Sequence, residues 1–141
     1  MNARNLIGST PLHLASENGK LGAALLLLDN GAFVGAKNRY GWTPLHYASR
    51  NNHVHIINLL IARGANVSER ANYSDDAPHI PPSVTPIMSA AKHGSFEAVQ
   101  QLLQKGANPR ETDSLSQNSF VLATKNGYNN IAQLLIKFVR V

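Results

Sequence analysis

Residues 8–16, Gly-Ser-Thr-Pro-Leu-His-Leu-Ala-Ser, recur 33 positions later as residues 41–49, Gly-Trp-Thr-Pro-Leu-His-Tyr-Ala-Ser. A third copy, Thr-Pro-Ile-Met-Ser-Ala-Ala, begins at Thr85. A weaker fourth copy, Asn-Ser-Phe-Val-Leu-Ala-Thr, begins at Asn118. Four copies in one consistent phase predict a repeat architecture, in which each unit buries its apolar face only by stacking on its neighbours.

Each copy predicts two helices. A threonine can cap the first helix, and the proline after it fits the first turn, where no N–H is needed. This helix is expected to end at a residue that tolerates the left-handed conformation: Gly19, Asn52, Gly94 or Gly127. Apolar positions predict a second helix over residues 21–29, 54–62, 96–104 and 130–137. Since the fourth copy has neither threonine nor proline at its start, we expect its first helix to lack a cap.

This unit resembles the ankyrin repeat, a helix–turn–helix with a hairpin, a 33-residue period and a Thr-Pro-Leu-His signature. The resemblance implies an all-α fold, an ankyrin-repeat solenoid of stacked helix-turn-helix units with β-hairpin loops. It covers nearly the whole chain, Asn2 to about Phe138, and predicts that residues 1–141 form a single domain. The repeats fall at about 5–37, 38–70, 80–112 and 113–141, with a nine-residue insertion within residues 71–83.

The insertion contains three prolines and two adjacent aspartates, which predict an extended loop. It is either a tolerated surface insertion or a loop that contacts a partner. Metal binding through Asp75, Asp76 and His79 is disfavoured, because flexible carboxylates and one imidazole lack a preorganised geometry. The boundaries of the array favour a fragment of a longer array over a short protein whose ends a partner covers.

The composition excludes several kinds of chemistry. The chain has no cysteine, so it has no disulfide, thiolate zinc site or cysteine nucleophile. It also has no His-Glu-x-x-His run, phosphate-binding loop or nucleophile elbow. The family resemblance assigns His13 and His46 a structural role, bonding backbone near a helix start. We therefore expect no enzyme activity, no cofactor and no metal.

Charge and hydropathy limit the partners. Thirteen Lys and Arg against eight Asp and Glu give a net charge of +5, a moderate bias toward acidic partners. No apolar run reaches the roughly 18–20 residues needed to cross a bilayer, and no secretory signal begins the chain. We expect an intracellular, cytoplasmic protein without membrane insertion, or one in the host cytoplasm if it is a pathogen effector. Nucleic acid is disfavoured because no recognised binding motif is present.

Ankyrin-like arrays commonly bind partners on a concave face made of hairpin tips and first-helix residues. Transferred by repeat phase, this resemblance predicts a row of exposed basic side chains along that face, Arg50, Lys92 and Lys125. The next position reads Asn51, His93 and Asn126. The second hairpin adds Arg39, Tyr40 and the single tryptophan, Trp42, which we expect to be exposed and to anchor a partner.

The sequence thus predicts a non-catalytic protein–protein interaction module that binds a protein partner, with an acidic segment, on its concave face. It takes no small-molecule substrate. The alternative is a regulatory or targeting segment of a larger enzyme, or of a secreted effector of an intracellular pathogen. In that case the chemistry lies outside these residues.

Overall fold

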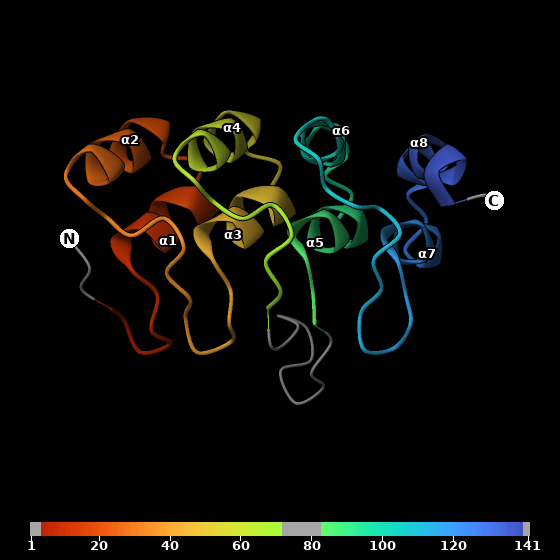
Figure 1. Ribbon diagram of the computed structural model, residues 1–141, viewed down its shortest axis with the longest axis horizontal. Coiled ribbons are helices and arrows are strands. Elements are labelled where there is room, and N and C mark those ends of the chain that lie inside the picture. The colour runs from red at the N-terminus through yellow and green to blue at the C-terminus, as the bar shows by residue number, and fades with distance from the viewer. Residues whose placement is uncertain (1–3, 72–82, 140–141) are drawn as a thin grey trace.

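The computed structural model describes residues 4–71 and 83–139, which form eight helices in two stacked layers with hairpins below them (Figure 1). The inner layer contains α1 (Pro11–Glu17), α3 (Pro44–Arg50), α5 (Pro86–Lys92) and α7 (Ser119–Lys125). The outer layer contains α2 (Leu21–Asp29), α4 (Val54–Ala62), α6 (Phe96–Gln104) and α8 (Asn129–Val139). The predicted all-α solenoid is confirmed.

The helix boundaries follow the repeat. The second helices of the first three repeats begin and end where the sequence predicts. In the fourth repeat α8 continues to Val139, past the predicted end at residue 137. The earlier second helices are each followed by a glycine with positive φ, such as Gly106. Val139 occupies that phase in α8 and is still helical, because valine does not favour the left-handed conformation.

One apolar core runs between the layers through all four repeats. It includes Leu45 and Ile87 from inner helices and Ile57, Leu60 and Val99 from outer helices, each at most 2% exposed. Every inner helix contacts the outer helix of its own repeat, and α1, α3 and α5 each contact the inner helix of the next repeat. Stability therefore comes from contacts between neighbours, as expected for a solenoid.

A threonine and a histidine connect the first repeat to the second. The Thr10 N–H donates to His13 Nδ1 at 3.0 Å, and the His13 N–H donates to Thr10 Oγ1 at 3.4 Å. Because Nδ1 accepts this bond, the neutral ring carries its proton on Nε2. His13 Nε2 therefore donates to the carbonyl of Trp42, 2.8 Å away in the next hairpin.

The second repeat has the same pair of histidine hydrogen bonds, and here they span the insertion. The Thr43 N–H donates to His46 Nδ1 at 3.1 Å, and His46 Nε2 donates to the carbonyl of Val84 at 3.0 Å. His46 is fully buried, and this burial lowers its pKa to about 4. Burial also lowers the pKa of His13. Both histidines are thus structural, as the family resemblance implies.

The third repeat lacks the side-chain cap that its threonine predicts, and the fourth repeat has a cap that was not expected. Met88 replaces the histidine in the third repeat, and Thr85 Oγ1 is buried there without a hydrogen-bond partner. In the fourth repeat Asn118 Oδ1 accepts the Val121 N–H at 2.9 Å. The expectation that the fourth repeat lacks a cap is wrong, because asparagine caps a helix as well as threonine does.

The hairpins are held by side-chain as well as backbone hydrogen bonds. Asn5, Asn38 and Asp113 occupy the same repeat phase, and each Oδ1 accepts two backbone N–H groups of its own turn. Within residues 4–71 and 83–139, extended pairing is limited to a bridge between Ala71 and Val84. These Asx turns replace a longer ladder of backbone hydrogen bonds.

The insertion is closed at its base. Ala71 and Val84 exchange backbone hydrogen bonds of 2.7 and 3.2 Å, and Arg70 Nη1 donates to the carbonyl of Ser83 at 2.8 Å. The repeat therefore resumes in phase immediately after the inserted residues. The predicted extended loop and the disfavoured metal ligands Asp75, Asp76 and His79 lie in 72–82, outside the described residues.

Two glycines make room for aromatic rings of the next repeat. A methyl group on Gly94, whose φ is +76°, would lie 2.5 Å from Tyr128 Cε1. A methyl group on Gly19 would lie 2.7 Å from His53 Cε1. Neither distance is tolerated by real Cβ atoms, so each glycine is required both by its backbone conformation and by the ring packed against it.

We predict that Gly94→Asn lowers the free energy of unfolding by about 1–3 kcal/mol through overpacking. The second repeat shows how the chain accommodates asparagine at this phase. It has Asn52 there, and the residue of the next repeat in the phase of Tyr128 is the small Ser95. Gly94→Asn combined with Tyr128→Ser should therefore recover at least half of the loss in urea denaturation.

The matched control is Gly127→Asn, which has the same phase and φ of +81° but no heavy atom within 4 Å of the added carbon. It should lose only the backbone contribution, under about 1 kcal/mol. A Gly94→Asn variant no less stable than Gly127→Asn would contradict the steric account.

We also predict a pH-dependent stability that depends on His46. Its pKa lies about 2.5 below the ordinary 6.5, so the unfolded chain binds this proton more tightly than the folded one. The contribution is complete above pH 6.5 and is lost as the pH falls toward 4, by about 3 kcal/mol. His46→Met, copying Met88, should remove that part of the slope in urea denaturation at several pH values. An unchanged slope would contradict burial of a neutral ring.

Candidate partner-binding face

The residues of the predicted basic row occupy the last position of their inner helices, which is the same phase in each repeat. This phase contains Glu17, Arg50, Lys92 and Lys125. The inner helices pack in sequence, α1 on α3, α3 on α5 and α5 on α7. The four side chains therefore follow one line across the array, with helices roughly 8–10 Å apart.

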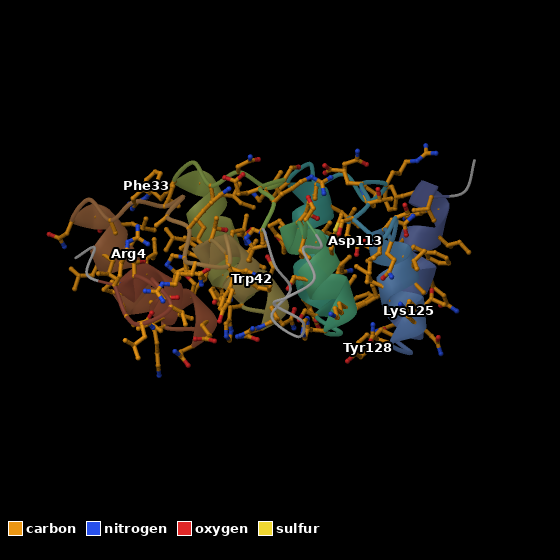
Figure 2. The ribbon with its side chains drawn as sticks, turned by 90° about the horizontal axis from the view of Figure 1, so that it is seen from below. Arg4, Phe33, Trp42, Asp113, Lys125 and Tyr128 are labelled. Carbon is orange, nitrogen blue, oxygen red and sulfur yellow. The ribbon has the colours of Figure 1, made fainter. Side chains whose placement is uncertain are left out.

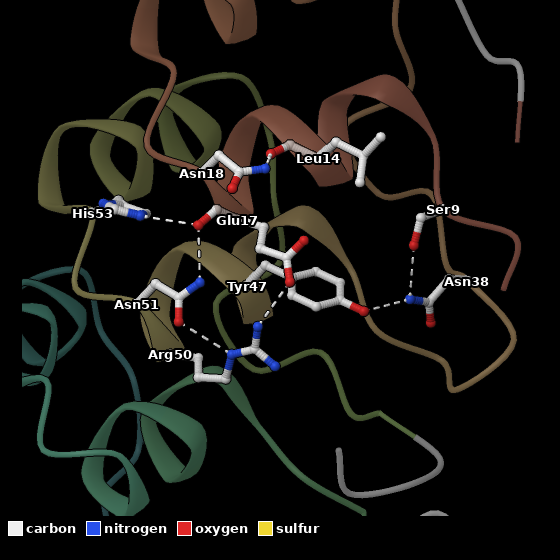
Figure 3. A network of polar contacts seen from close by, with 9 residues as sticks. All are labelled: Ser9, Leu14, Glu17, Asn18, Asn38, Tyr47, Arg50, Asn51 and His53. Carbon is white, nitrogen blue, oxygen red and sulfur yellow. Dashed lines mark hydrogen bonds and ion pairs between the residues drawn. The ribbon is translucent and has the colours of Figure 1, made fainter. Parts of the chain in front are cut away.

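Arg50 is occupied within the structure. Its Nη2 donates to Glu17 Oε2 at 2.9 Å (Figure 3). Its Cζ lies 5.6 Å from the Trp42 ring centroid and 5.0 Å from that of Tyr47. Only 18% of the Arg50 side chain is exposed. The expectation that Arg50 is exposed is wrong, because Glu17 and the two rings hold its guanidinium against the array.

The same corner contains further bonds between the first two repeats. The carbonyl of Glu17 accepts from Asn51 Nδ2 at 2.9 Å and from His53 Nε2 at 3.0 Å (Figure 3). Arg50 Nε donates to Asn51 Oδ1 at 3.2 Å. Asn51, predicted to contact a partner, thus bonds backbone of the preceding repeat. This part of the face has a structural role in the protein alone.

Trp42 is buried, and its predicted exposure is wrong. Its side chain is 1% exposed and forms a small core cluster with Tyr47 and Ala71. The Trp42 ring centroid lies 5.2 Å from that of His46 and 5.1 Å from that of Tyr47. Since the chain turns back after Gly41, the indole packs on α3 beside the base of the insertion. It cannot anchor a partner without unfolding.

Tyr47 joins this cluster to the hairpin. Its hydroxyl accepts from Asn38 Nδ2 at 2.8 Å, and Asn38 Nδ2 also donates to Ser9 Oγ at 3.2 Å. Burial raises the pKa of Tyr47, so the phenol stays protonated at neutral pH. The sequence does not reveal this link, because its three partners come from two different hairpins and a helix.

The basic end of the row lies over the third and fourth repeats. Lys92 is half-buried and Lys125 is exposed. His93 Nδ1 donates to the carbonyl of Ser89 at 2.9 Å, and Asn126 Nδ2 donates to the carbonyl of Leu122 at 2.8 Å. Figure 2, viewed from the hairpin side, shows Lys125 and Tyr128 toward one edge of the array and Phe33 toward the opposite edge.

The hairpin tips add apolar groups that the sequence analysis missed. Leu6 is 88% exposed and Leu115 is 57% exposed, while Tyr40 is half-buried beside the exposed Arg39. Leu115 has the repeat phase of Tyr40. A single apolar residue in a turn gives no periodic signal by itself, but this shared phase could have revealed it.

The described ranges show a surface of polar and apolar groups. Residues 4–71 and 83–139 contain no cluster of three His, Cys, Asp or Glu side chains that could hold a metal ion. In the same ranges no helix has the length and apolar character needed to span a membrane.

The stacked helix pairs and their hairpins define a helical repeat protein whose extended face suits binding. A family model for ankyrin repeats, comprising three copies, matches residues 1–71 and 73–140. The chain belongs to the ankyrin repeat family, whose members are generally protein–protein interaction modules and typically lack catalytic activity. No curated protein matches the chain.

We predict that Trp42→Ala lowers the free energy of unfolding by about 3–5 kcal/mol, since it removes a fully buried ring. The control is Phe33→Ala, whose side chain is 63% exposed and whose loss should cost under about 1 kcal/mol. Urea denaturation measures both. Near-equal stability of the two variants would contradict the buried position of the indole.

Proposed function

We propose that this ankyrin-repeat array binds an extended protein segment with acidic residues on the concave face of its third and fourth repeats. Lys92 and Lys125 supply the charge, with His93 and Asn126 beside them. Leu115 at the tip of the fourth hairpin supplies an apolar contact, and Tyr40 and Arg39 at the tip of the second hairpin extend the surface beyond these two repeats. The observation that carries the proposal is the pair of lysines, Lys92 and Lys125, in one repeat phase on the adjacent helices α5 and α7.

The spacing of the pair predicts the spacing of the acids. Adjacent helices lie about 8–10 Å apart, and an extended chain advances about 3.3 Å per residue. Two acidic side chains about three residues apart in an extended segment would therefore meet Lys92 and Lys125. The first two repeats contribute less, because Glu17 already neutralises Arg50.

The test begins with a displayed peptide library selected on the immobilised protein. We predict that the recovered peptides carry acidic residues at this spacing beside an apolar residue. Lys92→Glu with Lys125→Glu should weaken binding of a recovered peptide at least tenfold at low salt. The loss should be smaller at high salt, because exposed charges are screened beyond roughly 8–10 Å.

Lys105→Glu with Lys137→Glu is the matched control. Both lysines are exposed, Lys105 directly after α6 and Lys137 near the end of α8. The two double variants carry the same net charge. The control should keep nearly full affinity. Equal losses would show diffuse attraction by the whole protein, and recovered peptides without acidic residues would contradict the proposed partner chemistry.

A further inference from the structure

The helix α2 is apolar on almost every side. Its sequence, Leu-Gly-Ala-Ala-Leu-Leu-Leu-Leu-Asp, leaves Leu21, Leu25 and Leu26 between 42% and 65% exposed. The corresponding outer surfaces of α6 and α8 carry glutamine, asparagine and lysine. A helix without a polar face is normally buried, so the exposed leucines of α2 indicate a surface that another protein chain covers.

The outer side of this repeat is hollowed. Leu14, Ala23 and Leu27 help to line a shallow depression of about 470 Å³. In the second repeat the residues in phase with Ala23 and Leu27 are Ile56 and Leu60, which are at most 1% exposed beneath the preceding helices. The depression is therefore the half of an inter-repeat contact that the preceding repeat covers elsewhere in the array.

The fourth repeat presents the complementary half at the opposite end of the row (Figure 1). Phe120 and Ala132 are half-buried, and Ile136 is 37% exposed. Residues in phase with Phe120 and Ala132, such as Leu45 and Ile57, are buried against the next repeat. The surface of α7 and α8 thus has the pattern that covers a depression like that of the first repeat.

The charges at the two surfaces are also complementary. Between the first and second repeats Glu17 pairs with the same-phase Arg50. Where the fourth repeat of one copy meets the first repeat of another, Lys125 takes the place of Glu17 and Glu17 takes the place of Arg50. Lys125 of one copy is then followed by Glu17 and Arg50 of the other, so the charges alternate in sign across the junction. Inside the chain, by contrast, Arg50, Lys92 and Lys125 follow one another with the same sign.

We propose that the outer face of α1 and α2 binds a second copy of this chain, through the face formed by α7 and α8. Residues 4–9 of the second copy already form the hairpin before α1, so the junction requires only two helix pairs to stack. This head-to-tail contact uses two different surfaces. It does not close on itself, and longer assemblies form as the concentration rises.

Sedimentation equilibrium tests this with two variants. Ala23→Glu places a charge in the exposed depression, and Ile136→Glu places one on the opposite face. Wild type should rise in average mass from 15.3 kDa past the mass of a dimer. Each variant alone should stay monomeric, because one of the two surfaces that the contact requires is blocked in every copy. Their equimolar mixture should form dimers and stop there, through the single intact junction.

The control is Gln100→Glu, on the exposed surface of α6, which should associate like wild type. Lys125→Glu should weaken association at least tenfold at low salt. Circular dichroism confirms that each variant is folded, and Leu14→Gln provides a second variant that blocks the depression. A monomeric wild type at millimolar concentration overturns the proposal. A wild-type dimer unaffected by Ile136→Glu also overturns it and indicates two first repeats face to face.

Discussion

The hydrogen bond from a buried histidine to a backbone carbonyl of the next hairpin links the first three repeats of this array. A single helix pair cannot bury its apolar face, so each repeat depends on the position of its neighbour. His13 and His46 fix that position while also closing the start of their own helices. The bond from His46 is important because it crosses the insertion and sets the third repeat in register.

The polar groups of the inner helices therefore have two roles. In the first two repeats, Glu17, Arg50 and Asn51 bond across the junction, with Trp42 beneath them. Over the last two repeats the same phase carries Lys92 and Lys125, and the proposed acidic partner is assigned to that part of the face. The exposed apolar groups divide similarly, between hairpin tips that suit a partner and an α2 surface that suits another repeat.

The parts of the structure that could be predicted from sequence are local or periodic. The 33-residue phase placed the second helices of three repeats without error, because capping residues and glycines act within a few positions. Trp42 was misplaced because its burial depends on Ala71 and Val84, which meet it only after the insertion is closed. The cap from Asn118 was missed because the family signature, rather than the chemistry of asparagine, guided that expectation.

The protonation of His13 and His46 tests the account most directly, because both bonds require the neutral ring with its proton on Nε2. Long-range nitrogen–proton NMR correlation of the imidazoles at pH 8, above the ordinary imidazole pKa, reports the protonation of each ring nitrogen. We predict that both rings show a single Nε2–H tautomer with Nδ1 unprotonated. A protonated ring, or rapid exchange between tautomers at either position, would contradict the histidine hydrogen bonds that link these repeats.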